Sequence, residues 1–254
     1  MKELVKDFSK KYTLVLIIFL LAGLVGGFLA GLDLLDSYPP EMKEEIFSQG
    51  FNETTLAVVT GVQYATYGFV LGIFGIILAK NIRLWKDKFT LEPKPFIYAA
   101  IVGIIGGVSM IAFDLIWFGK EVPLIADSYL VKPSVATILG SMILGGIVEE
   151  VMLRLFMMSL IAFVLLKIFR KTEKADVIFI VANIISALLF AAGHLPSTQI
   201  LLGLTPIIIF RCFLLNGGLG LLFGRLYRKH GIMYAMIAHA ACHLVSKLIW
   251  IVFI

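Results

Sequence analysis

Two adjacent carboxylates and a guanidinium lie in a long apolar stretch of the sequence. Glu149, Glu150 and Arg154 are the only charged residues between Lys132 and Lys167. An ionisable side chain at membrane depth costs at least about 2.5 kcal/mol, so it is retained mainly where it is paired or faces a polar cavity. Three such side chains within six positions therefore mark a candidate site.

The spacing of these three residues assigns them different environments. Glu150 and Arg154 are four residues apart, so on a helix they share one face, with the carboxylate in the favourable N-terminal position. Glu149 is rotated by about 100° from Glu150, so Arg154 cannot pair equally with both. A carboxylate without a strong partner suits general-base work. The alternative is a structural ion-pair network that packs helices together.

Three histidines occur in other apolar segments. His239 and His243 are four residues apart on one helix face, which lets two imidazoles converge on one metal ion or one oxyanion. His194 follows Phe190 by four residues at the end of another segment. The alternative is that these histidines line a hydrated seam or form ordinary hydrogen bonds.

Carboxylates and histidines on three separate helices are the pattern from which cavity sites in helical bundles are built. The set includes no serine or cysteine placed as a nucleophile, so it favours an activated water. The predicted reaction class is hydrolysis.

The composition indicates a polytopic membrane protein. Of 254 residues, 60% are hydrophobic and only 15% are charged, which is far outside the soluble range. The connections are too short for a separate domain, so residues 1–254 are predicted to form one transmembrane domain. The net charge of +5 reflects membrane topology and does not predict nucleic-acid binding. Cys212 and Cys242 lie in apolar stretches and predict no disulfide framework.

Seven segments are long enough to cross the roughly 30 Å hydrocarbon core. The fold class is therefore all-α: a bundle of seven transmembrane helices around a polar cavity. An eighth span is an alternative, because Pro206 and Arg211 interrupt the sixth segment. The predicted spans are residues 13–35, 55–79, 95–118, 134–167, 176–194, 199–224 and 231–253.

Basic residues recur in alternate connections. The N-terminus and the loops 80–94, 167–175 and 225–230 are basic, whereas the other connections are acidic, balanced or uncharged. The positive-inside rule then predicts a cytoplasmic N-terminus. Because the first apolar run is too long for a cleavable signal, residues 13–35 are expected to stay as an uncleaved span.

Several further features complete the expected architecture. Residues 36–54 predict a solvated loop with an interfacial helix. Glycines recur at four-residue spacing, which lets helix backbones approach closely in lipid; they are Gly23, Gly27, Gly31, Gly103, Gly107, Gly220 and Gly224. Asp114 and Asn216 are candidate cavity residues, and Arg211 and Lys247 are expected to act as counter-ions or to extend toward an interface.

Depth along straight helices conflicts with a single site. Measured from the basic loops at about 1.5 Å per residue, Glu149 and His194 lie about 27 Å deep, whereas His239 and His243 lie about 12–18 Å deep. These groups can meet only if a helix bends or exceeds its span, or if the topology differs. The fourth segment, residues 134–167, is too long for one straight crossing and must tilt, kink or protrude.

The order of these motifs resembles the CPBP family, the intramembrane proteases related to CAAX prenyl endopeptidases of type II and to the Abi proteins. The family's two glutamates followed by an arginine match Glu149, Glu150 and Arg154, and its phenylalanine and histidine match Phe190 and His194. Its closing histidine matches His239. His243, however, stands where the family usually has asparagine. The resemblance covers residues 134–250, which would form the catalytic core.

The resemblance implies a role for each matched residue. Glu149 would activate a water with help from His194, while Glu150 and Arg154 would support the site. His239 would stabilise the oxyanion, with His243 as its partner. Because His243 replaces asparagine, Glu149, His194, His239 and His243 could instead bind zinc as four N/O ligands.

The predicted function is an intramembrane endopeptidase of glutamate or metallo type. Its substrate would be a membrane-embedded peptide or a lipid-modified, CAAX-like prenylated protein within the bilayer. The alternative is a membrane scaffold or transporter that retains the fold without proteolysis, because transport proteins also carry intramembrane ionisable residues.

Overall fold

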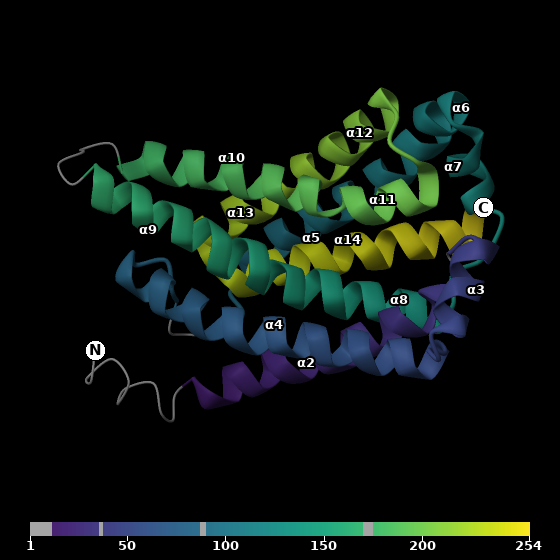
Figure 1. Ribbon diagram of the computed structural model, residues 1–254. Helices are drawn as coiled ribbons and strands as arrows, with labels where there is room; N and C mark the ends of the chain where they lie inside the picture. The colour runs from purple at the N-terminus through teal and green to yellow at the C-terminus, as the bar shows by residue number, and fades with distance from the viewer. Residues whose placement is uncertain (1–11, 36–37, 87–89, 170–174) are drawn as a thin grey trace.

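The chain is a bundle of long helices that lie roughly side by side (Figure 1). The structure, a computed structural model, describes residues 12–35, 38–86, 90–169 and 175–254, which form helices and no strands. Through the fifth span, the helices are α2 (Thr13–Leu32), α3 (Pro40–Ser48), α4 (Glu53–Asn81), α5 (Pro93–Phe113), η2 (Asp114–Phe118), α6 (Gly119–Glu121), α7 (Pro123–Ser128), α8 (Val135–Ile143), η3 (Leu144–Glu149), η4 (Val151–Met158), α9 (Ser159–Ile168), α10 (Ala175–Gly193) and α11 (Leu195–Leu202). The rest are α12 (Pro206–Cys212), η5 (Phe213–Gly217), α13 (Gly218–His230) and α14 (Ile232–Phe253), and the η segments are π-helical turns.

Seven helices within the described ranges are long and apolar enough to cross a membrane, which confirms the seven-span prediction. Consecutive α and π segments join end to end in the longer spans. Many leucine, isoleucine, valine and phenylalanine side chains on these helices are exposed. This pattern is expected for helices whose outer faces contact lipid, because lipid tails are as apolar as the side chains. The spans are 13–32, 53–81, 93–121, 135–168, 175–202, 206–230 and 232–253.

The predicted boundary between the fifth and sixth spans was wrong. The fifth span does not end at His194 but continues through α11 to Leu202, and the sixth begins at Pro206. Gly203 ends α11 at φ 73°, a left-handed conformation that glycine adopts without strain. Thr205 then caps α12 by accepting a hydrogen bond from the Ile208 N–H. Pro206 therefore starts a helix rather than interrupting one, and in the described chain no eighth span forms.

The predicted glycine contacts are present between neighbouring spans. A Cβ on Gly23 would collide with the Tyr64 carbonyl, and one on Gly27 would lie 2.7 Å from the Thr60 oxygen, so α2 packs directly on the α4 backbone. On α5, a Cβ on Gly107 would lie 2.6 Å from the Cys242 carbonyl oxygen of α14. These glycines set helix–helix distances, which confirms their packing role.

Different elements lie at the two ends of the bundle. The ends of α9 and α13 and the starts of α10 and α14 lie toward the side at which α2 starts, whereas α3, α6, α7 and the C-terminus lie at the opposite side (Figure 1). The interfacial helix expected within residues 36–54 forms as α3. The basic N-terminus, residues 1–11, lies outside the described residues, as do residues 87–89 and 170–174 of two basic loops.

The length of the fourth span removes the depth conflict between the carboxylates and the last histidines. This span runs for 34 residues from Val135 to Ile168. Its α9 end, with the start of α10, projects beyond the turn between α13 and α14 (Figure 1). Glu149 and Glu150 nevertheless meet His239 of α14. Of the three ways in which the groups could meet (a bend, a helix longer than its span, or another topology), the structure shows a 34-residue helix with π-helical turns at the glutamates.

Candidate active site

The two glutamates lie where the fourth span is least regular. Glu149 ends the π-helical turn η3, and Glu150 stands between it and η4. π-Helical turns change which face each residue occupies and occur often at functional sites. Here they leave the Glu149 side chain 23% exposed and the Glu150 side chain fully buried, at 0%. The two neighbours therefore have different surroundings, as their spacing predicts.

Glu150 and Arg154 form the expected ion pair. The Arg154 Nη1 atom lies 3.1 Å from Glu150 Oε1, off the axis of a hydrogen bond, and both side chains are buried. The guanidinium also lies over the ring of Phe190 at 4.4 Å and near that of Phe223 at 5.5 Å. Ring faces attract cations, so two aromatic side chains supplement the single carboxylate. The pair neutralises two charges inside the bundle.

His239 connects the two glutamates. Its Nδ1 atom lies 2.9 Å from Glu150 Oε1, and its Nε2 atom lies 3.9 Å from Glu149 Oε2. An ionised carboxylate only accepts hydrogen bonds, so in the ion pair with Arg154 the Glu150 carboxylate accepts from the Nδ1–H of His239. In the neutral ring, Nε2 then carries a lone pair directed toward Glu149. The ring of Phe223 stacks on His239 at 4.6 Å and holds its plane.

His243 completes a stack of two imidazoles. Its ring lies 5.0 Å from that of His239, with an angle of 21° between the planes. A Cβ built on Gly145 would lie 2.5 Å from His243 Nε2 and 3.3 Å from His239 Nε2. Both Nε2 atoms therefore border the same small space, which exists because residue 145 has no side chain. The Nδ1 atom of His243 is buried without a hydrogen-bond partner in the described chain.

His194 lies at the edge of this group rather than in direct contact with it. It follows α10, and its Nδ1 atom is 2.8 Å from the Phe190 carbonyl oxygen. Because a carbonyl only accepts, Nδ1 carries the proton and Nε2 the lone pair. Phe190 meets His194 edge-on at 4.8 Å and His239 at 5.7 Å, so its ring lies against both histidines. Among the described contacts, none joins His194 directly to Glu149.

The predicted zinc ligands are only partly gathered. Nε2 of His239 and of His243 border one space, and neutral imidazole nitrogen is a suitable zinc ligand. Glu149 is 3.9 Å from His239 Nε2, and His194 stands apart. Over the described residues, no group of three or more His, Cys, Asp or Glu side chains lies close enough to hold a metal ion. As arranged here, the four residues do not fit a zinc centre.

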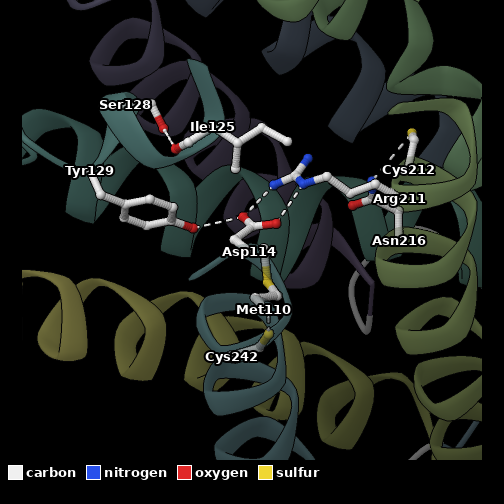
Figure 2. A network of polar contacts seen from close by, with 9 residues as sticks. All are labelled: Met110, Asp114, Ile125, Ser128, Tyr129, Arg211, Cys212, Asn216 and Cys242. Carbon is white, nitrogen blue, oxygen red and sulfur yellow. Dashed lines mark hydrogen bonds and ion pairs between the residues drawn. The ribbon is translucent and has the colours of Figure 1, made fainter. Parts of the chain in front are cut away.

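A second buried polar cluster centres on Asp114 (Figure 2). Arg211 on α12 donates from Nε to Asp114 Oδ1 at 2.6 Å and from Nη2 to Oδ2 at 2.5 Å. The Tyr129 hydroxyl donates to Asp114 Oδ2 at 2.7 Å. Burial, and then the Asp114 carboxylate, raise the pKa of Tyr129, so its hydroxyl stays protonated. This cluster ties the sixth span to the third and to the 119–133 connection.

Two polar candidates, Asn216 and Lys247, join neither group. Asn216 donates to Cys212 Sγ at 3.5 Å on its own helix, and Lys247 lies over the Trp250 ring at 5.1 Å. Arg211 is the counter-ion of Asp114, which is one of the two roles predicted for it. Tyr129 and Phe223 were not predicted as polar-cluster or site residues. With 20 phenylalanines in the chain, nothing in the sequence distinguishes Phe223.

Comparison with known proteins gives one family match, over the region that carries this site. The family model described as "Type II CAAX prenyl endopeptidase Rce1-like" matches residues 131–245. That region contains Glu149, Glu150, Arg154 and all three histidines of the site. Neither the curated proteins nor the solved structures include a significant match. Residues 131–245, which carry the glutamates and the histidines, are therefore similar to the type II CAAX prenyl endopeptidase Rce1-like family.

Proposed function

We propose that this protein is an intramembrane endopeptidase that hydrolyses a peptide bond in a membrane-embedded or lipid-modified substrate. The observation that carries the proposal is the partly exposed Glu149 carboxylate beside the lone pair of His239 Nε2, at 3.9 Å. A buried, neutralised Glu150–Arg154 pair fixes the ring of His239 behind it. Because these groups lie within membrane spans, a substrate must reach them from the bilayer or through its lipid group.

Water attack on the peptide carbonyl would begin at Glu149. Its carboxylate takes a proton from water while the water oxygen bonds to the carbonyl carbon, and the carbonyl electron pair moves onto oxygen. When the tetrahedral intermediate collapses, the C–N bond breaks and Glu149 returns the proton to the leaving nitrogen. The products are a carboxylic acid and an amine. His194, at the edge of the site, would help to position the water.

His243 is the better of the two stacked histidines as donor to the oxyanion. The single proton of neutral His239 is committed to Glu150 through Nδ1, so its Nε2 cannot donate. His243 has no such commitment, and a proton on its Nε2 would point at the space beside Gly145. Its unpartnered Nδ1 would then be a lone pair, which costs less to leave unpaired than an N–H group. This reverses the roles that the family resemblance implies for His239 and His243.

Substituting Gly145 tests that arrangement. A Cβ in Gly145→Ala would occupy the space that both Nε2 atoms border, so we expect peptidase activity to fall about 100- to 1000-fold, as when an oxyanion donor is lost. Gly218→Ala is the matched control, because a Cβ there meets nothing within 4 Å. Initial rates on one membrane peptide, at equal amounts of folded protein, measure both. Full activity of Gly145→Ala would exclude the space beside Gly145 as the oxyanion site.

A zinc-dependent form of the same hydrolysis is the alternative outcome, although as arranged here His239, His243 and Glu149 do not fit a zinc centre. Zinc bound by these residues would supply a Lewis acid. Metal analysis of purified protein separates the two candidates. The metal-free proposal predicts well below one zinc per chain and a rate unchanged by chelation. One zinc per chain, lost in His243→Ala together with activity, would favour the metal form.

The basic connections further support a cytoplasmic N-terminus, through the positive-inside rule. The site would then be reached from a bilayer in which the α9–α10 end faces the cytoplasm.

The direct test of the function is turnover. Purified protein in lipid nanodiscs is incubated with a prenylated peptide and with its unmodified counterpart. The proposal predicts cleavage of at least the prenylated one, whereas no cleavage of either, or of any transmembrane peptide, would favour a scaffold or transporter.

A further inference from the structure

A cavity of about 390 Å³ opens where four spans begin or end, away from the glutamates. Trp85 follows the end of α4, Glu92 precedes α5, and His230 ends α13 just before α14. Such ends lie at the level of the lipid headgroups, where tryptophan and tyrosine side chains collect. The cavity is lined by Trp85, Lys86, Thr90, Glu92, Pro95, Lys229, His230 and Tyr234.

The walls of this cavity are held by side chains from separate helices. The Tyr234 hydroxyl accepts from the Glu92 N–H at 2.8 Å and donates to the Thr90 carbonyl at 3.2 Å, so it fastens the 90–92 segment to α14. The His230 ring lies edge-on to Tyr98 at 6.2 Å and to Tyr234 at 6.0 Å. The cavity is therefore built by tertiary contacts.

Among the described residues that line this cavity, there are two ammonium groups and one carboxylate. Lys86 and Lys229 are exposed, and both lie within electrostatic range of His230, as does Glu92. The aliphatic stem of Lys86 crosses Gly231, where a Cβ would lie 2.9 Å from Lys86 Cγ. This contact places Lys86 at the first turn of α14. Lys86 and Gly231 also line an adjoining crevice together with Ile232 and Met233, the first residues of α14.

The start of α14 adds a further positive contribution. Gly231, with φ 106°, offers no side chain to cap this 22-residue helix. The uncapped end of a helix presents N–H groups and a partial positive charge, which favour an anion. Gly231, Ile232 and Met233 line the adjoining crevice rather than the cavity itself. Lys86 and Lys229 therefore supply the charge that makes the cavity complementary to a phosphate group. The aromatic walls and the headgroup level favour a phosphate attached to lipid.

We propose that this cavity binds the phosphate headgroup of an anionic phospholipid. Lys86 and Lys229 would pair with the phosphate oxygens, and Trp85 and Tyr234 would contact the glycerol region. Lipid bound there would join the ends of α4, α5, α13 and α14. The site is separate from the candidate active site, so it stands whether or not the protein is a peptidase.

Lipid-dependent stabilisation tests the proposal. The melting temperature of the full chain in neutral detergent is followed during titration with phosphatidylglycerol, phosphatidylcholine or inorganic phosphate. We expect stabilisation by phosphatidylglycerol alone. For Lys86→Gln/Lys229→Gln, half of the shift should require about 30-fold more lipid, since each lysine near an anionic surface contributes about a factor of five. Lys167→Gln/Arg225→Gln removes two charges at the same end outside the cavity and should respond as the wild type does.

Three results would overturn the proposal. The first is an equal response of the two double variants, which would mean a diffuse surface effect. The second is stabilisation by inorganic phosphate with nothing added by phosphatidylglycerol, which would assign a soluble anion. The third is stabilisation by phosphatidylcholine to the same extent. If the cavity double variant is misfolded without lipid, Lys229→Gln, at an exposed position, is compared with Arg225→Gln, and about a fivefold difference is expected.

Discussion

Glu149→Gln is expected to lower the rate of peptide cleavage by about 10²- to 10⁴-fold, the usual contribution of a positioned general base. The amide keeps the size of the side chain but cannot take a proton from water. Since Glu149 is 23% exposed and not part of the buried ion pair, the melting temperature should stay close to that of the wild type. Cleavage rates and thermal unfolding, measured on the same preparation, check both statements.

Glu149→Asp is the matched variant, because it retains a carboxylate but withdraws it by one methylene. We expect it to keep more activity than Glu149→Gln at similar stability. Wild-type turnover by Glu149→Gln would remove Glu149 from the chemistry. An equal loss in both variants, accompanied by unfolding, would mean that Glu149 acts through packing alone.

Arg154→Met is expected to destabilise the fold by about 3–5 kcal/mol, the usual cost of removing one partner of a buried ion pair. The Glu150 carboxylate is fully buried and would lose its only cationic partner in the described chain. The contacts of the guanidinium with the Phe190 and Phe223 rings would also be lost. The measurement is the free energy of unfolding in detergent.

A double variant separates charge from packing in this result. In Glu150→Gln/Arg154→Met no uncompensated charge remains, so the double variant should be more stable than Arg154→Met alone. Its neutral amide can still accept the hydrogen bond from His239 Nδ1. If the double variant is as unstable as the single one, lost packing and not the unpaired carboxylate accounts for the destabilisation.

The spans could be predicted because a helix that crosses a bilayer needs about 20 consecutive, mostly apolar residues. Such segments are visible in the sequence. The sequence also predicts the Glu150–Arg154 pair, which depends only on local spacing. The end of the fifth span was misplaced at His194 because Leu195–Leu202 continues as helix until Gly203 and Thr205 separate α11 from α12. Pro196, Ser197 and Thr198 suggest a loop after His194, but in the structure they lie in the first turns of α11.

Contacts between distant segments could not be predicted in the same way. Arg211 meets Asp114 across 97 residues, and His239 meets Glu150 across 89. The contacts of these side chains depend on how the π-helical turns η2, η3 and η5 rotate the helix faces on either side of them. No residue pattern in the sequence predicts those turns. Regular helical spacing therefore predicts which residues share a helix face. It does not predict which atom of another helix each side-chain nitrogen contacts. That partner decides which histidine can donate to an oxyanion.

Cleavage in water enriched in ¹⁸O tests the central claim most directly. Wild type and Glu149→Gln, each folded in nanodiscs, receive one lipid-modified peptide, and mass spectrometry follows both fragments. The account predicts that wild type yields two fragments, with one ¹⁸O atom in the new carboxyl terminus, and that Glu149→Gln yields at most about one-hundredth as much. Intact peptide with wild type, or equal cleavage by both proteins, would contradict it.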